Sequence, residues 1–118
     1  MTEQSIKRGE VWKVKLDPTQ GSEMQKTRPS VVVSNDVINE RSAVVMICPV
    51  TGFTNKAGRI HIFVPKGDGG LEKDSLVHCG QMRAVDKTRL VYKMGVLSES
   101  KMAEIQTGLS IVLDLPRP

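Results

Sequence analysis

The chain has 118 residues, a length that suits a single domain spanning residues 1–118. Apolar residues make up 39% of it and the formal net charge is +4, which excludes a disordered chain and fits, without requiring, a polyanionic partner. No apolar run reaches the length of a membrane span and the polar start lacks the apolar segment of a signal peptide, so we expect a cytoplasmic protein.

Alternating apolar and polar residues predict a first strand at 10–16. Trp12, Val14 and Leu16 share one face of this strand, and lysines take the other, wet face. A polar loop rich in turn-forming residues follows and ends at Arg28.

The next two apolar segments predict buried strands. Residues 30–34 are apolar enough to be buried on both faces, and Asn35-Asp36 ends this strand. Residues 43–50 predict a central strand that Pro49 closes. A second polar loop, 51–58, comes after it.

The remaining segments predict further strands at 59–64, 75–79 and 92–97. The chain then changes to a helical period, with Ser98 as a plausible N-cap and Glu99 favourable to the helix dipole. The apolar positions of this helix are Met102, Ile105, Leu109, Val112 and Leu113. We therefore expect a mainly β fold, a small barrel-like sheet capped by a C-terminal α-helix.

The two cysteines, Cys48 and Cys79, form no CxxC pair and lie among apolar residues, so we expect buried free thiols. His61 and His78 are the only histidines, and their spacing resembles no ligand pair. We predict no metal site and no cofactor.

Familiar catalytic motifs are missing, and what remains is polar residues where loops meet strands, namely Glu23, Arg28, Thr51, Gln81 and Arg83. Taken singly, each has a structural explanation. Glu23 could be a solvated acid, Thr51 could bond the backbone, and Arg83 could pair with Asp86. Arg28 precedes Pro29 and a buried strand, so its backbone is held, which suits either an ion-pair donor or a group that grips an anion.

Several short motifs occur in a fixed order: Arg8-Gly9-Glu10-Val11-Trp12, Leu16-Asp17-Pro18, Gly21-Ser22-Glu23, Arg28-Pro29, Pro49-Val50-Thr51 and 81–87. In this order they closely resemble the MazF/PemK/Kid family of toxin endoribonucleases, from Arg8 to about Arg89. The predicted terminal helix agrees with that resemblance.

The resemblance implies an SH3-like β-barrel with a terminal helix, usually a homodimer. It also implies metal-independent, sequence-selective cleavage of single-stranded RNA, held in check by a cognate MazE-like antitoxin. Arg28 and Thr51 match the principal active-site residues of the family, and Glu23 matches its loop acid. Because RNA carries its own nucleophile, the 2′-hydroxyl, we expect 2′,3′-cyclic phosphate and 5′-hydroxyl ends.

The resemblance also assigns RNA contacts, at Gly21, Ser22, Lys26, Thr27, Pro29, Thr54, Asn55, Lys56, His78, Gln81 and Arg83. One departure matters for the chemistry. Some members carry an acid immediately before the Gln, where this chain has Gly80, so the partners that transfer protons stay open. Glu23 is the best candidate for a base by position, ahead of the two histidines.

Two other functions stay open at this point. The first is a non-catalytic poison on the same barrel, like the related CcdB toxins that target DNA gyrase. The second is a passive nucleic-acid-binding module. Since aromatic residues are only 3% of the chain, any nucleic acid would be held by phosphate contacts and hydrogen bonds more than by stacking.

Overall fold

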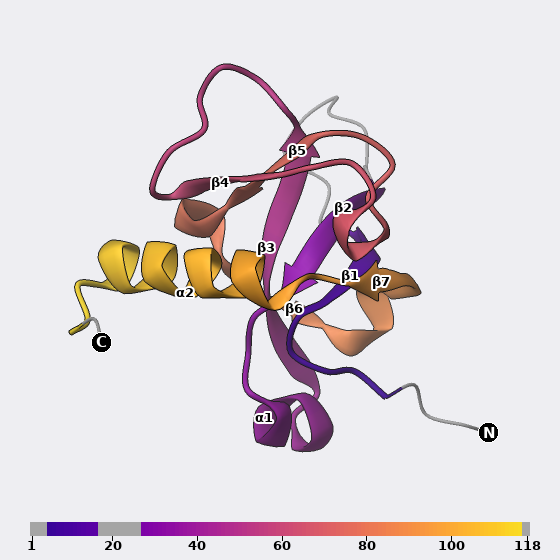
Figure 1. Cartoon of the computed structure of the whole chain (residues 1–118). Helices are drawn as coiled ribbons and strands as arrows, with labels where there is room; N and C mark the ends of the chain where they lie inside the picture. The colour runs from indigo at the N-terminus through magenta and orange to yellow at the C-terminus, as the bar shows by residue number, and fades with distance from the viewer. Residues whose placement is uncertain (1–4, 17–26, 117–118) are drawn as a thin grey trace, which may run out of the picture.

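The computed structural model describes residues 5–16 and 27–116, and this part of the chain is mainly β with a C-terminal helix (Figure 1). Its strands are β1 (Glu10–Lys15), β2 (Thr27–Val32), β3 (Val44–Gly52), β4 (His61–Val64), β5 (Ser75–His78), β6 (Arg83–Asp86) and β7 (Leu90–Val96). Its helices are α1 (Asp36–Arg41) and α2 (Glu99–Leu113), with 3₁₀ turns η1 (Asp68–Gly70), η2 (Cys79–Gln81) and η3 (Lys87–Arg89).

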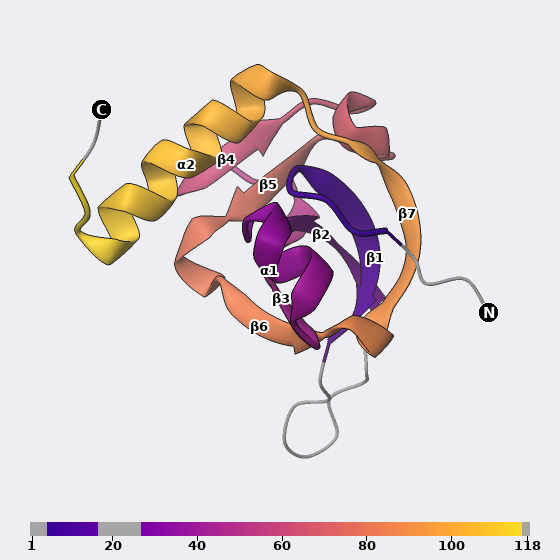
Figure 2. The same cartoon turned by 90° about the horizontal axis from the view of Figure 1, so that it is seen from below.

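The strands form one antiparallel sheet in the order β4-β5-β3-β2-β1-β7, and β6 pairs with β3 outside this path. β3 is the central strand, as predicted, because it pairs with β6, β2 and β5 in turn along its length. The sheet is strongly bent, with α1 in front of its centre and α2 along its outer side (Figure 2). Within the described residues, β4 and β7 end the pairing order, so this pairing does not close the sheet into a barrel.

Pro49 does not close β3, so that prediction was wrong. The strand runs on to Gly52, and Pro49 lies opposite Ser30 of β2. Pairing with β2 ends at Pro49 and pairing with β5 begins at Val50. A residue without an N–H is tolerated here because β3 changes partners at this point.

The sequence prediction missed α1 and β6. α1 follows the expected turn: the Asn35 side chain accepts a hydrogen bond from Ile38 N at 2.9 Å and caps the helix. Val37 and Ile38 are exposed while Asn39 is buried, so the helix has no apolar stripe to reveal it. β6 is four residues long and buries only Val85, which is too little for a periodic pattern.

The core is divided between the two faces of the sheet. One group of buried residues includes Val11, Val31 and Cys48, and the other includes Trp12, Val32 and Ile47. Neighbouring residues of β2 thus belong to different groups, which confirms that this strand is buried on both faces. Among the β1 lysines, Lys15 is exposed and Lys13 half-buried.

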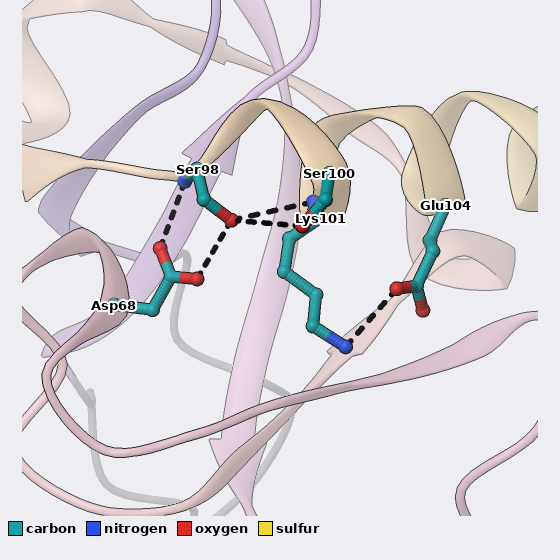
Figure 3. A network of polar contacts seen from close by, with 5 residues as sticks. All are labelled: Asp68, Ser98, Ser100, Lys101 and Glu104. Carbon is teal, nitrogen blue, oxygen red and sulfur yellow. Dashed lines mark hydrogen bonds and ion pairs between the residues drawn. The ribbon is translucent and has the colours of Figure 1, made fainter.

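Helix α2 begins where the sequence predicted, with Ser98 as its N-cap (Figure 3). Ser98 Oγ accepts from Lys101 N at 3.3 Å, and it donates to Asp68 Oδ2 at 2.8 Å. Ser98 N donates to the other carboxylate oxygen of Asp68, also at 2.8 Å, so the cap ties η1 to the helix. Met102 and Ile105 are buried, as predicted, whereas Val112 and Leu113, which were predicted to belong to the same apolar stripe, are exposed.

The two cysteines are buried free thiols, as predicted. The hydrogen bond with Cys79, and then burial, raises the pKa of the Cys48 thiol well above its ordinary value. Both thiols belong to the core group that α2 covers, next to Ile105.

The Arg8-to-Trp12 motif has a structural role at the start of β1, where Glu10 makes several polar contacts. Glu10 is buried, and its Oε1 accepts from Trp12 Nε1 at 2.9 Å and from Lys7 N at 3.0 Å. Its Oε2 lies 3.0 Å from Lys93 Nζ of β7. The motif therefore fastens the N-terminal segment and β7 to β1.

Across the described ranges 5–16 and 27–116, no helix combines the length and apolar character that crossing a membrane requires.

Candidate active site

The strand pairing brings Arg28 and Thr51 to the same end and face of the sheet. Ser30 of β2 lies opposite Pro49 of β3. Arg28 lies two residues before Ser30 and Thr51 two residues after Pro49, just beyond the last residues that pair β2 with β3, so the alternation of side chains assigns both to the face that Ser30 and Pro49 share. Residues opposite each other across an antiparallel pair share a face.

A pocket of about 350 Å³ lies at this end of the sheet. Its lining includes Thr27, Arg28, Pro29 and Thr51, so the Arg-Pro motif and the threonine of β3 meet at one hollow. A larger hollow of about 570 Å³ lies elsewhere; it is lined by residues such as Arg41, and no predicted site residue that the structure describes belongs to its lining. The smaller pocket is the candidate active site because Arg28 and Thr51 both line it.

Arg28 has the held backbone that the sequence predicted. It lies within β2, opposite Val14 of β1, and Pro29 next to it lies opposite Lys13. The Arg28 side chain is half-buried. The paired strand holds the backbone that carries this guanidinium at the pocket, and a guanidinium suits recognition of a planar or tetrahedral anion.

Thr51 makes its short contact with a histidine and not with the backbone. Its Oγ1 is 2.7 Å from His78 Nε2, whereas Gly52 O is 3.4 Å away. Thr51 lies opposite Leu76 of β5, which makes His78 its diagonal neighbour across the strand pair. The ring of His61, opposite His78 on β4, packs edge-on against the His78 ring with centroids 5.2 Å apart.

The surroundings of His78 favour a neutral ring. Burial, followed by the positive charges of His61 and Arg28, lowers the pKa of His78 below its ordinary value. Its Nδ1 is buried and has no hydrogen-bond partner among the described residues. His78 was expected to touch RNA, and the structure places it first of all against Thr51.

The lining of the pocket also includes two lysines that the sequence analysis did not predict as site residues. Lys13 and Lys73 line it together with Arg28, and Glu72 is the only acid among the described residues of the lining. A Cβ at Gly52 would meet Lys73 Nζ at 3.3 Å, so this ammonium passes close to the backbone next to Thr51. Three cations against one carboxylate make the pocket suitable for an anion. Lys13 could have been found from its strand alternation, but nothing near Lys73 in the sequence marks it.

Most of the other predicted site residues that the structure describes do not line the pocket. Glu23, Gly21, Ser22 and Lys26 lie outside the described residues. Thr54, Asn55 and Lys56 are exposed between β3 and β4; Gln81 is exposed in η2 and Arg83 half-buried at the start of β6. Of these described residues, none lines the pocket. Gly80 is exposed, and a Cβ there would meet only Ile60 at 3.9 Å.

Comparison with known proteins identifies the family. A family model described as PemK-like, MazF-like toxin of type II toxin-antitoxin system matches residues 7–113. The chain belongs to this toxin family. The Endoribonuclease MazF of Staphylococcus epidermidis is 41% identical to the chain over 111 residues, covering 93% of this chain and 92% of that protein. The resemblance based on the sequence motifs is thereby confirmed.

Solved structures of this toxin family share the fold. The MazE–MazF complex (Form-II) from Deinococcus radiodurans matches with a TM-score of 0.81 and 21% identity, covering 97% of this chain and all of that one. An endoribonuclease in complex with its cognate antitoxin, from Mycobacterial species, matches with a TM-score of 0.76 and 22% identity, covering 98% of this chain and 100% of that one.

Proposed function

We propose that the chain is a sequence-specific toxin endoribonuclease that cleaves single-stranded RNA in the cytoplasm. On this proposal residues 1–118 form one toxin domain, and the bent sheet with its C-terminal helix is a variant of the SH3-like barrel. The observation that carries the proposal is the meeting of Arg28 and Thr51 at a basic pocket in a chain of this toxin family.

The chemistry needs little from the protein besides positioning and charge. The 2′-oxygen of the ribose attacks the adjacent phosphorus, the bond from phosphorus to the 5′-oxygen breaks, and the departing oxygen takes up a proton. The products are a 2′,3′-cyclic phosphate and a 5′-hydroxyl. Donors that are already in place stabilise the charge that grows on the phosphoryl oxygens.

Arg28 and Thr51 supply those donors on this proposal. The planar guanidinium of Arg28 binds two phosphoryl oxygens at once, and the Thr51 hydroxyl donates to one of them. Arg28 is not the base, because a guanidinium donates hydrogen bonds and offers no acceptor for a proton. Glu23 is the proposed base, in keeping with its place in the family motif.

The remaining basic groups hold the RNA backbone. Lys13 and Lys73 flank the pocket, and the exposed loop at Thr54, Asn55 and Lys56 extends the surface that RNA would cover. Binding should weaken with salt, with a log–log slope of roughly −0.7 for each phosphate neutralised.

We propose two protein partners. The first is a second copy of the chain, forming a homodimer whose RNA site draws on both subunits. The second is a cognate MazE-like antitoxin, an acidic segment that is disordered when free and that covers the pocket; a structural relative is an endoribonuclease in complex with its cognate antitoxin. Sedimentation at micromolar concentration tests the dimer, and a fully active monomer would contradict it.

The decisive test is incubation of the pure protein with a long unstructured RNA in EDTA, followed by mapping of the new 5′ ends. We expect cuts at a few sites that share a short motif. A protein that cuts nothing, with or without Mg²⁺, would instead be a gyrase poison or a passive binding module. Activity lost in EDTA and restored by Mg²⁺ would contradict the metal-independent mechanism.

A further inference from the structure

We propose that His78 is a positioning residue for Thr51: its Nε2–H donates to Thr51 Oγ1 and turns the threonine's own proton toward the scissile phosphate. The inference rests on the proposed role of Thr51 and gives that residue a partner within this chain. It assigns His78 a task other than the direct RNA contact that the family resemblance suggested.

The geometry of the pair is that of a hydrogen bond made by two held side chains. The Nε2···Oγ1 distance is 2.7 Å, and the two residues are diagonal neighbours on the paired strands β3 and β5. The edge-on ring of His61 limits rotation of the His78 ring from the β4 side. Thr51 is therefore oriented from the protein side before RNA binds.

The unpartnered Nδ1 atom decides which nitrogen carries the proton. A neutral imidazole has one N–H, at Nδ1 or at Nε2. With the proton at Nδ1, a buried donor would lack a partner within residues 5–16 and 27–116, and a buried donor without a partner is rarer in proteins and costlier than such an acceptor. The proton therefore belongs on Nε2, where Thr51 Oγ1 accepts it.

The charged form of His78 is disfavoured for the same reason. It would place an N–H at the unpartnered Nδ1 and add a positive charge near Arg28 on β2 and His61 on β4. The lowered pKa of His78 agrees with this arrangement.

The consequence for Thr51 concerns its own proton. Because Oγ1 accepts from His78, the hydroxyl hydrogen must point elsewhere. The other contact of Oγ1 in the described structure is Gly52 O at 3.4 Å, which is too long to hold the proton firmly. An anionic phosphoryl oxygen in the pocket is a better acceptor, and hydrogen bonds linked in a chain strengthen one another.

Two substitutions separate this role from a general structural one. His78→Gln retains a donor near the position of Nε2, whereas His78→Leu removes it. We expect the Leu variant to cleave RNA roughly tenfold more slowly in single-turnover assays, the rate equivalent of one ordinary hydrogen bond, and the Gln variant to keep most of the rate. A Gln variant as slow as the Leu variant would overturn the donor assignment.

The matched background is Thr51→Val, which has no hydroxyl for His78 to position. There, we expect His78→Leu to have no further effect on the cleavage rate, because the two residues act through one hydrogen bond. If His78→Leu slows cleavage by the same factor in both backgrounds, His78 does not act through Thr51 and the inference fails.

Nitrogen NMR of the histidine rings tests the tautomer in the wild-type protein, where folding of a variant is not in question. We expect a proton on Nε2 and a bare Nδ1 at pH 7. A proton on Nδ1 would overturn the inference even if the protein cleaves RNA. A wild-type protein that cuts no RNA would contradict the proposed function. The NMR measurement would still show whether His78 Nε2 donates the hydrogen bond to Thr51.

Discussion

Glu10 and His78 are both polar side chains set into the sheet, and their bonding differs. Both oxygens of Glu10 have partners: Trp12 and Lys7 on one, Lys93 on the other. In the part of the chain that the structure describes, the His78 ring has one hydrogen-bond partner, Thr51, and a buried nitrogen with none. The first arrangement leaves nothing for a ligand to complete, which is typical of a group that holds a fold together. The second is incomplete and adjoins an exposed, basic pocket, which is typical of a site.

The difference separates motifs that look alike in the sequence. The Arg8-to-Trp12 motif and the Arg28-Pro29 motif both contribute to the family resemblance, and each contains an arginine. Yet Arg8 N donates to Asp36 Oδ1 at 2.7 Å and its Nε donates to Val33 O at 3.2 Å, so Arg8 ties segments of the fold together. Arg28 lines the pocket. One of these two motifs therefore holds segments of the fold together, and the other contributes to the lining of the pocket.

Removing Arg28 should give the largest effect. We expect Arg28→Ala to lower the single-turnover cleavage rate by roughly 10²–10³, because the transition state loses a donor that is already in place. Arg41→Ala, an exposed arginine on α1, is the matched control and should cleave at the wild-type rate. Equal losses in the two variants would mean that overall charge, and not the site, drives cleavage.

Removing the Thr51 hydroxyl should give the next largest effect. Thr51→Val keeps the shape of the side chain, and we expect cleavage to slow by roughly 10- to 100-fold, the value of a hydrogen bond to a charged oxygen. Thr51→Ser should recover part of the rate, and Thr107→Val on the exposed side of α2 should change nothing. A Val variant with wild-type single-turnover kinetics would reduce Thr51 to a structural residue.

Glu10→Gln should lower the stability of the fold and leave the cleavage rate unchanged, the reverse of what we expect at Arg28 and Thr51. The amide cannot replace both acceptors and loses the charge that pairs with Lys93, so we expect the free energy of unfolding to fall by about 1–3 kcal/mol. Urea unfolding measures this change, with Glu104→Gln as an exposed control expected within about 0.5 kcal/mol of wild type. Loss of cleavage without loss of stability would place Glu10 in the site.

The smallest expected effect is a pH dependence of stability that comes from His78. Its pKa is lowered in the folded protein, so below the ordinary value of 6.5 the unfolded chain binds the proton and the folded one does not. The contribution of His78 to stability is therefore complete above pH 6.5 and declines as the pH falls through that value toward the lowered pKa. Asp36 and Asp86 have pKa values below 3.8 and titrate outside this window.

Chemical unfolding at several pH values between 5 and 7.5 measures this dependence. The difference between the wild type and His78→Gln isolates the contribution of His78. We expect the variant to have the shallower decline on the acid side. Identical pH profiles would show that the His78 ring titrates alike in both states.

Much of the fold could be predicted from the sequence, because local periodicity reports which strands and helices bury a face. β1, β2, β3 and α2 were all predicted this way. α1 was missed because its apolar residues are exposed, and β3 was cut short because the pattern does not reveal that a strand changes partners at Pro49.

Less of the candidate site than of the fold could be predicted from the sequence. Arg28 and Thr51 were found through family motifs, whereas the contact between Thr51 and His78 depends on the register of β3 against β5. Lys73 reaches the pocket from the segment after η1, which no sequence spacing relates to Gly52. Contacts made across strands depend on pairing, and pairing is set by the whole sheet and not by neighbouring residues.

The most direct test of this account is single-turnover cleavage by Arg28→Lys, measured beside its melting curve. Lysine keeps the charge but cannot reproduce the planar fork that contacts two phosphoryl oxygens. We predict that the Lys variant loses nearly as much rate as Arg28→Ala, with a melting temperature close to that of the wild type. A Lys variant that cleaves at nearly the wild-type rate, or an Ala variant that melts many degrees lower, would make Arg28 a structural tether and contradict the account.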